Sequence, residues 1–304
     1  MNNLPRLIYL KDRAVLHITG EDALVFLDGL FTCNMQKKLP RFGALLSPQG
    51  KILFDFIIHT AEAGYYIDCA KSIAADFIKR LGFYKLRAKV NIVDVSDKFC
   101  VVVSWNVQDL PLIRRFAPPS PTGGEGCTDP RLEALGHRHI VSKDVYTRLK
   151  GGHDDSESNK ICDYHAHRLT LGVPESGKDF AFGEAFPHEV LMDQLNGVDF
   201  KKGCYVGQEV VSRMQHRGTA RTRFMQVVLP EPLEFVQPAP IMAGSKIMGE
   251  LRSVAGLHGL ALVRIDRVSE AMDAGQDLTV DGTIIHIKKP GFAQFEFPVV
   301  ETKG

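Results

Sequence analysis

Apolar residues recur at two different spacings in the first part of the chain, and these spacings separate strands from helices. Short apolar runs at 6–10 and 14–20 predict two strands that pair with each other. In the next segment, 21–31, apolar residues fall three and four apart, which is typical of one face of a helix. Thr19 or Gly20 stands where a cap for that helix is expected. The chain should therefore open with a strand pair that enters a helix.

A second block of apolar runs predicts a β-meander over 43–70. Its turns are SPQG and AEAG, because Pro and Gly supply the dihedral angles that tight turns need. An amphipathic helix is expected over 73–89 with Ser72 as its cap, and strands at 90–96 and 98–105 should pair antiparallel. Strands and helices in this order indicate the α+β class, with helices packed on one face of an antiparallel sheet.

Two segments in the middle of the chain have the composition of surface loops. The first, 117–130, is rich in Pro and Gly, and the second, 151–160, is polar. One strand and a short helix are expected between them. A further helix over 161–171 should end at Gly172, since Pro174 cannot continue it.

Beyond this helix the pattern changes twice. Residues 173–203 show no periodicity, and irregular segments of this length often carry function. A helix is expected over 207–217, followed by short strands with Gly and Asp turns that are typical of a small β-barrel or sandwich. We therefore predict two domains: an α+β region over 1–219, which the two loops divide into subdomains, and a C-terminal β-barrel over 220–304.

Composition and charge narrow the class of protein. The chain has 304 residues, a hydrophobic fraction of 44% and a net charge of +1. These values are ordinary for a globular protein, and no overall field draws the chain to nucleic acid or anionic membrane, although a local basic patch remains open. No apolar run reaches about 18 residues, so no membrane span is expected. The N-terminus has neither the pattern of a secretory signal nor the composition of a transit peptide.

One of the six cysteines differs from the rest. No two of them form a C-x-x-C pair, so we expect no metal site within this chain and five small buried side chains. Cys204 instead precedes the helix expected over 207–217 and follows Lys201 and Lys202. Nearby cations and a helix N-terminus both stabilise a thiolate. From these residues alone, a functional thiol and a buried packing residue are equally open.

Other side chains carry weaker signals. Tyr164 and Arg168 share a helical face, where they could hold a flat acidic heterocycle or pack in the core. Asp55 interrupts an apolar strand and faces either a cavity or solvent, and Glu189 is similarly ambiguous. The chain contains no G-x-S-x-G, P-loop, G-x-G-x-x-G or H-E-x-x-H motif. Hydrolase, nucleotide-binding and zincin functions therefore lack their usual parts.

The segment KKGCYVGQEVVSR, 201–213, resembles the K-G-C-[FY]-x-G-Q-E signature of the YgfZ family of tetrahydrofolate-binding proteins. These proteins are relatives of the aminomethyltransferase, or T-protein, of the glycine cleavage system. The resemblance extends to the helix region 15–35, the hairpin 45–58, the segment 168–180 and the C-terminal β region. It covers most of the chain, although residues 110–160 are not diagnostic.

The resemblance implies a ring-like GcvT-like fold, with an α+β folate-binding region, a C-terminal barrel and tetrahydrofolate in a central pocket. It also implies a role in making or repairing [4Fe–4S] clusters in a subset of enzymes, including radical-SAM enzymes that modify tRNA. Partners would be Fe–S client enzymes or cluster-assembly proteins, with no direct contact with nucleic acid or membrane.

The same resemblance implies a set of site residues. Asp55 is the nearest match to a T-protein aspartate that assists methylene transfer, but Phe54 stands where the T-protein has a second acid. Tyr164 falls where an aromatic ring stacks on the pterin, and Glu189 where an acid bonds the pterin amino groups. The functional thiol and the remaining folate-binding candidates are Cys204, Arg168, Lys202 and Tyr205.

Three functions stay open at this point. The first is a folate-dependent Fe–S maturation factor with Cys204 as its reactive centre. The second is a folate-dependent aminomethyltransferase with Asp55 as its acid. The third is a non-catalytic folate-binding scaffold in which Cys204 is structural. Because no targeting segment is recognised, we expect a bacterial cytoplasmic protein, or a mitochondrial matrix protein if the source is eukaryotic.

Overall fold

The computed structural model describes residues 6–105, 127–150, 161–218 and 220–297. The chain divides into two compact units, and each is described by itself. The first unit contains residues 1–164 and 195–208, and the second contains residues 165–194 and 209–304.

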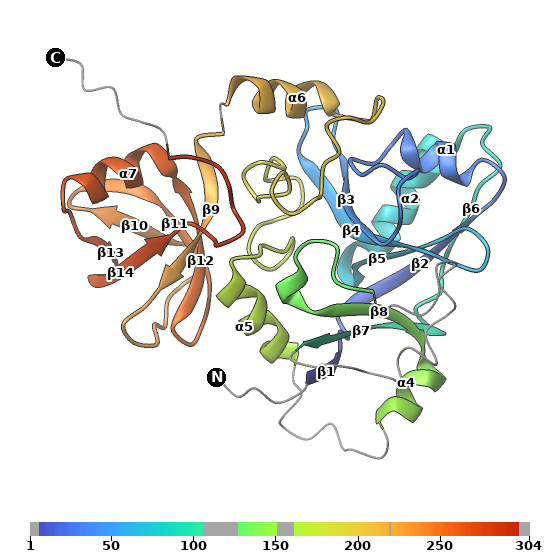
Figure 1. Ribbon diagram of the computed structural model, residues 1–304, viewed down its shortest axis with the longest axis horizontal. Coiled ribbons are helices and arrows are strands. Elements are labelled where there is room, and N and C mark those ends of the chain that lie inside the picture. Colours follow the sequence, from blue (N-terminus) through green and yellow to red (C-terminus); the bar gives the residue numbers. More distant parts are fainter. Residues whose placement is uncertain (1–5, 106–126, 151–160, 219, 298–304) are drawn as a thin grey trace. The chain divides into compact units, whose positions relative to one another are not determined.

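A five-stranded antiparallel sheet forms the centre of the first unit (Figure 1). Its order is β3-β4-β5-β2-β6. The bounds of these strands are Arg13–Thr19 for β2, Arg41–Leu46 for β3, Ile52–Thr60 for β4, Tyr65–Ala70 for β5 and Asn91–Asp94 for β6. Side chains alternate across the sheet, so its two faces bury different residues.

Helices α1, Ala23–Asp28, and α2, Ala74–Lys85, cover one face of this sheet. Leu27 of α1 and Phe77 of α2 are fully buried in the core between them and the strands. The ring of Phe77 stacks on Phe54 of β4 with centroids 4.6 Å apart. A short 3₁₀ turn, Lys71–Ile73, leads into α2. This apolar layer holds the strands of the sheet in place. The opposite face of the same sheet carries the polar candidate site residues.

A three-stranded antiparallel sheet of order β1-β7-β8 packs on that opposite face. Val15 of β2, Val101 of β7 and Tyr164 share one buried cluster, which joins the two sheets. The remaining elements of this unit are β1 Arg6–Tyr9, β7 Phe99–Trp105, η2 Glu133–Leu135, β8 His137–Ser142 and α4 Lys143–Lys150. Helix α5, Ile161–Leu171, begins in this unit and continues into the second.

The second unit contains a closed six-stranded barrel of order β10-β11-β12-β9-β14-β13. Closure leaves no open sheet edge. Its elements are β9 Thr222–Val228, β10 Ala239–Ala243, β11 Lys246–Ala255, β12 His258–Arg264, α7 Ile265–Asp273, β13 Leu278–Val280 and β14 Thr283–Lys288. Helix α6, Gln208–Arg217, precedes the barrel in sequence. The α+β class with antiparallel sheets and a C-terminal barrel is therefore confirmed.

Most of the elements expected from the sequence are present, but two strand pairings are wrong. β1 pairs with β7 rather than with β2, and β6 pairs with β2 rather than with β7. Alternation identifies a strand and its buried face but not its partner, which is decided by the apolar layer that the face joins. Helix α7 interrupts the C-terminal strands and was not expected.

Both predicted helix caps in the first unit are also wrong. Asp22 stands at the N-cap of α1, and its carboxylate accepts a hydrogen bond from the backbone N–H of Lys89 rather than from the helix. Ile73, and not Ser72, stands at the N-cap of α2, because the 3₁₀ turn occupies the preceding residues.

Several predictions from the sequence cannot be compared with the structure. The loop 151–160 and most of 117–130 lie outside the described residues. The domain boundary at 219/220 stays a prediction, since the compact units divide the chain within α5 and α6 instead. No helix in the described part of the chain has the length and apolarity needed to cross a bilayer.

Candidate functional site

The segment around Cys204 is held to the first unit by the buried ammonium group of Lys202. The Lys202 side chain is only 1% exposed. Its Nζ donates hydrogen bonds to the backbone carbonyls of Asp28, of Phe31 at 2.7 Å and of Cys33 at 3.1 Å. These carbonyls belong to the end of α1 and the residues after it, where helical carbonyls lack intrahelical partners. Lys202 therefore anchors the segment and is not a solvated cation beside the thiol.

Tyr205 and Gly207 provide two more anchors in the same segment. Tyr205 is buried, its ring centroid lies 5.4 Å from Lys202 Nζ, and burial raises its pKa to about 12. Gly207 has a φ of +80°, and a Cβ at this position would lie 2.5 Å from the carbonyl oxygen of Ser47. Only glycine fits there without backbone displacement.

A further polar contact ties down the residues before Cys204. The backbone N–H groups of Asp199 and Lys201 donate to Thr32 O and to Asp199 Oδ1, both at 2.9 Å. Lys37 Nζ donates to Asp199 Oδ2 at 2.5 Å. Burial raises the pKa of Asp199, but the hydrogen bonds from Lys37 and from the Lys201 backbone, with the nearby positive charges, together outweigh it, and the pKa lies below its ordinary value. The loop is thus fixed on both sides of the thiol.

Between these anchors, Cys204 itself is exposed. Its neighbour Gly203 is also exposed, with open space where a Cβ would lie. Helix α6 begins at Gln208, so three residues separate the thiol from the first helical residue. The arrangement presents a thiol to solvent on a fixed loop.

The other cysteines do not share this setting. Cys33, Cys69 and Cys100 are buried, and burial raises their pKa values to about 12, 12 and 11. A buried thiol with a raised pKa is inert at neutral pH. Cys127 is only half-buried and Cys162 of α5 is exposed, so the prediction of five buried cysteines is wrong for these two.

Asp55 lies on the face of β4 opposite the apolar core. Phe54 and Phe56 point into that core, so Asp55 and His59 share the other face. Asp55 is 7% exposed, as is His59. The Nε2 atom of His59 has no hydrogen-bond partner among the described residues. Burial lowers the pKa of His59 to about 4, so the ring is neutral at pH 7.

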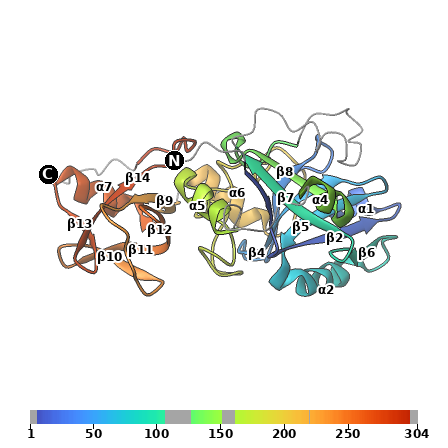
Figure 2. The same cartoon turned by 90° about the horizontal axis from the view of Figure 1, so that it is seen from below.

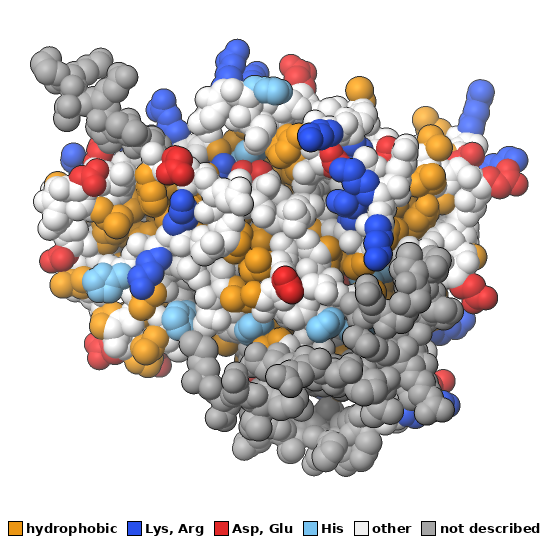
Figure 3. All heavy atoms as spheres, in the orientation of Figure 1, with side chains coloured by type: hydrophobic (Ala, Val, Ile, Leu, Met, Phe, Trp, Pro, Cys, Tyr) orange, Lys and Arg blue, Asp and Glu red, His pale blue; other side chains and the backbone are white. Residues whose placement is uncertain are grey.

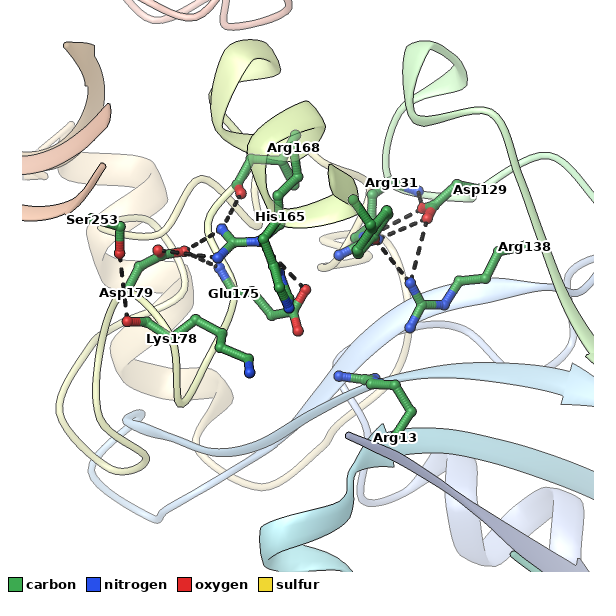
Figure 4. A network of polar contacts seen from close by, with 12 residues as sticks. Arg13, Asp129, Arg131, Arg138, His165, Arg168, Glu175, Lys178, Asp179 and Ser253 are labelled. Carbon is green, nitrogen blue, oxygen red and sulfur yellow. Dashed lines mark hydrogen bonds and ion pairs between the residues drawn. The ribbon is translucent and has the colours of Figure 1, made fainter. Parts of the chain in front are cut away.

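Tyr164 belongs to a buried polar network that sequence reasoning missed, and Figure 4 labels its three arginines, Arg13, Arg131 and Arg138. The Tyr164 hydroxyl accepts hydrogen bonds from Arg131 Nη2 at 2.6 Å and from Arg138 Nη1 at 3.0 Å. Arg138 and Arg13 each donate from Nε to Asp68, at 2.6 Å. Burial raises the pKa of Asp68, but the two guanidinium groups outweigh it and hold the pKa at about 2.

The same network continues to Asp129. Arg131 donates two hydrogen bonds to this carboxylate, at 2.9 Å and 2.7 Å, which is the bidentate geometry that favours arginine. The available sequence signal was one charged side chain, Arg13, Asp68 or Arg138, within each of the strands β2, β5 and β8. No sequence pattern states that Asp68 of β5 meets Arg138 of β8, because that contact depends on how the sheets stack.

Arg168 and Glu189 lie in the second unit, where both bind protein groups. Arg168 is 2% exposed and donates from Nη1 to Asp179 Oδ2 at 2.5 Å and to the Val173 carbonyl at 3.1 Å (Figure 4). Glu189 Oε2 accepts from the backbone N–H of Phe186 at 2.8 Å. Both side chains hold the irregular segment 172–194 in place.

Only some of the candidate residues in the first unit are suited to contact a folate. A carboxylate can accept hydrogen bonds from the amino and ring N–H groups of a pterin, and the buried Asp55 supplies that chemistry on the same face of β4 as His59, four residues further along the strand. Tyr164 is fully buried with its hydroxyl bound by two arginines, and Lys202 is engaged by carbonyls. Asp55 and His59 are thus the residues here that fit such a ligand, while Tyr164 and Lys202 serve the protein interior.

Comparison with known proteins agrees with this architecture. Residues 221–295 match the family model of the CAF17 C-terminal β-barrel domain. The crystal structure of glycine cleavage system aminomethyltransferase T from Bartonella henselae is similar over 95% of this chain and 86% of its own, with a TM-score of 0.73 and 14% identity. At that identity the likeness establishes the fold alone. The protein therefore has the fold of the aminomethyltransferase T class.

Sequence relatives define the family within that class. The iron–sulfur cluster assembly factor IBA57 of Mus musculus is 32% identical over 287 residues, covering 85% of this chain and 77% of its own length. The Homo sapiens protein of the same name is 29% identical over 297 residues, with the same coverage. The Neurospora crassa homologue is 32% identical, and the chain spans 53% of its length. The chain belongs to the IBA57 family of iron–sulfur cluster assembly factors, and these relatives are named as mitochondrial.

Proposed function

We propose that this protein binds tetrahydrofolate and assists the assembly or repair of [4Fe–4S] clusters, with Cys204 as its functional thiol. Its clients would be a subset of Fe–S enzymes that includes the radical-SAM enzymes that modify tRNA. Its K-G-C-Y-V-G-Q-E segment, 202–209, resembles the YgfZ signature and supports the proposal that it is a YgfZ-type protein. Family membership supports the Fe–S role, and the fold supports folate as the ligand.

The fixed, outward-facing loop around Cys204 is the observation that carries this proposal. Lys202, Tyr205 and Gly207 each serve the loop's own structure, and Cys204 between them has no such use. A thiolate is a ligand that iron accepts, and an Fe–S cluster needs several ligands. One exposed thiol therefore fits a shared or transient role in which a partner protein supplies the remaining ligands.

The folate part of the proposal rests on Asp55 in the first unit. We infer that its buried carboxylate accepts hydrogen bonds from the pterin, with His59 as a further polar group on the same face of β4. The remaining residues assigned by resemblance, Tyr164, Arg168, Glu189, Lys202 and Tyr205, stay predictions as ligand contacts. Each of them already binds a protein group or is buried by one.

A matched pair of cysteine variants tests the functional thiol. Cys204→Ser and Cys162→Ser each remove one exposed thiol from the first unit. In cells lacking the native protein, we expect Cys162→Ser to restore tRNA modification by radical-SAM enzymes and Cys204→Ser to fail at equal protein level. Full rescue by Cys204→Ser would leave the scaffold function as the better description.

Titration calorimetry with tetrahydrofolate separates the ligand from the thiol. Wild type and Cys204→Ser should bind equally, whereas Asp55→Asn should bind more weakly because the carboxylate acceptor is lost. No binding by wild type would remove folate from the proposal and leave the Fe–S role standing. Tetrahydrofolate-dependent ammonia release from an aminomethyl-lipoyl substrate, abolished in Asp55→Asn, would instead identify an aminomethyltransferase.

The proposed location depends on the source of the chain. Its named relatives are mitochondrial, which supports the mitochondrial matrix if the source is eukaryotic. In a bacterium we propose the cytoplasm. In either case the proposed partners are Fe–S client enzymes or cluster-assembly proteins.

A further inference from the structure

The outer face of α2 carries large apolar side chains that are exposed to solvent and do not pack in the core. Helix α2 buries Ala74, Phe77 and Leu81 against the five-stranded sheet, as an amphipathic helix should. On the opposite side, Phe83 is 64% exposed and Leu86, the C-cap residue, is 89% exposed. Large apolar side chains exposed together at one helix end indicate a binding surface.

The backbone at Leu86 is strained, and its side chain is exposed. Leu86 has φ 42° and ψ −105°, a left-handed conformation that a residue with a Cβ rarely adopts. Glycine would fit this conformation at lower cost, and yet leucine is present. The Leu86 side chain contributes little to folding at this exposure, so its presence points to a use outside the fold.

Basic residues surround the two apolar side chains. Lys79 and Arg80 precede Phe83 by four and three positions, so they lie next to it on the same helical face. Both are exposed, as is Arg87. Between Phe77 and Val93 the sequence contains five Lys and Arg residues and no Asp or Glu. We call the set Lys79, Arg80, Phe83, Leu86 and Arg87 the α2 outer face.

We propose that the α2 outer face binds the surface of an anionic lipid membrane. Phe and Leu insert at the boundary between headgroups and acyl chains, while Lys and Arg beside them bind lipid phosphates. The three cations of the α2 outer face complement lipid phosphates, and this charge favours an anionic lipid surface as the occupant. The surface is a peripheral contact on the outside of the first unit, where α2 lies along one edge (Figure 2).

The neighbouring helix α1 extends the apolar character of this end. Val25 of α1 is 77% exposed. The start of α1 is tied to the residues after α2, because Lys89 N donates to Asp22 Oδ2 at 2.7 Å and Lys89 Nζ pairs with Glu21 at 2.7 Å. Figure 3 shows hydrophobic side chains over the part of the first unit where α1 lies, with basic and acidic side chains at their edges. A membrane contact at this end would therefore involve more than one helix.

Vesicle flotation with the full chain tests the proposal. Wild type should float with vesicles of equal parts phosphatidylcholine and phosphatidylglycerol and stay behind with phosphatidylcholine alone. The double variant Phe83→Ser, Leu86→Ser should lower partitioning by about tenfold, because two apolar side chains lose their lipid contact. The matched control is Val236→Ser, which removes an 86% exposed apolar side chain from the second unit and should float as wild type does.

Charge variants test the contribution of the basic residues to membrane binding. Each positive charge removed from the face should lower partitioning about fivefold, so Lys79→Glu with Arg80→Glu should abolish flotation. The exposed Lys246→Glu is the control and should retain it. Thermal melting confirms that each variant is folded. Absence of wild-type flotation at low salt would overturn the proposal, and so would equal flotation of wild type and the Phe83, Leu86 variant.

Discussion

At the scale of single residues, Lys202 explains much of the signature that surrounds Cys204. The sequence suggested a cation that stabilises a thiolate. The structure places its ammonium group against three backbone carbonyls, with the side chain 1% exposed. The residue that seemed to activate Cys204 instead fixes the loop that presents it, and this distinction can be tested by stability measurements.

We expect Lys202→Met to lower the free energy of unfolding by about 3 kcal/mol. Methionine fills a similar volume but leaves the carbonyls of Phe31 and Cys33 without their donor in a buried site. The control is Lys201→Met at the adjacent exposed position, which should change stability by less than about 0.5 kcal/mol. Urea unfolding followed by circular dichroism measures both. Equal effects from the two variants would contradict a buried anchor.

At the scale of elements, the end of α2 lacks the glycine that is common where a helix ends. Helices commonly end with glycine in a left-handed conformation. Leu86 holds a positive φ without that freedom. The backbone strain at this residue has a measurable consequence for stability that is separate from any binding role.

We predict that Leu86→Gly raises the free energy of unfolding by about 1 kcal/mol. Relief of a strained backbone is worth about 1–3 kcal/mol, and the added freedom of the unfolded glycine offsets part of it. Leu257→Gly provides the control, because Leu257 is also an exposed leucine in a turn but is not among the positive-φ residues. It should lose about 0.5–1 kcal/mol. A destabilised Leu86→Gly protein in chemical denaturation would show that the leucine side chain packs after all.

Elements could be predicted from the sequence far better than their pairing. The meander 43–70, the helices α5 and α6 and the barrel strands follow from local periodicity and turn residues. The partners of β1 and β6 do not, because both sheets offer a similar apolar strand face and the choice depends on tertiary packing. The caps failed for a related reason, since a 3₁₀ turn that no residue pattern marks shifted the start of α2.

At the scale of the whole molecule, the candidate site could be predicted only in part. Cys204 could be singled out because its signature is contiguous in sequence. The network around Tyr164 could not, because Asp68 and Arg138 are 70 positions apart and meet only once two sheets have stacked. His59 was missed for the same reason: its unsatisfied nitrogen is a property of the assembled layer. A motif that is contiguous in the sequence can be recognised from the sequence alone, whereas a buried polar layer built from distant strands cannot.

That buried layer should make the stability of the protein fall in mild acid. Burial lowers the pKa of His59 to about 4 and that of His139 to about 3, and in the unfolded chain a histidine titrates at about 6.5. Between pH 6.5 and about 4 the unfolded state therefore binds more protons than the folded state, and the free energy of unfolding decreases as the pH is lowered. Asp68, with its pKa held at about 2, adds to the loss only below its ordinary value of 3.8.

A histidine pair isolates this effect from general acid sensitivity. Each buried neutral histidine contributes a slope of up to about 1.4 kcal/mol per pH unit, so His59→Gln should flatten the dependence by about that amount. His286→Gln removes an exposed histidine from β14 and should leave the slope as it is in wild type. Urea unfolding of the three proteins at pH 7, 6 and 5 gives the slopes directly. A His59→Gln protein with the wild-type slope would mean that His59 becomes protonated within the folded layer, and the ring would then be charged rather than neutral in this pH range.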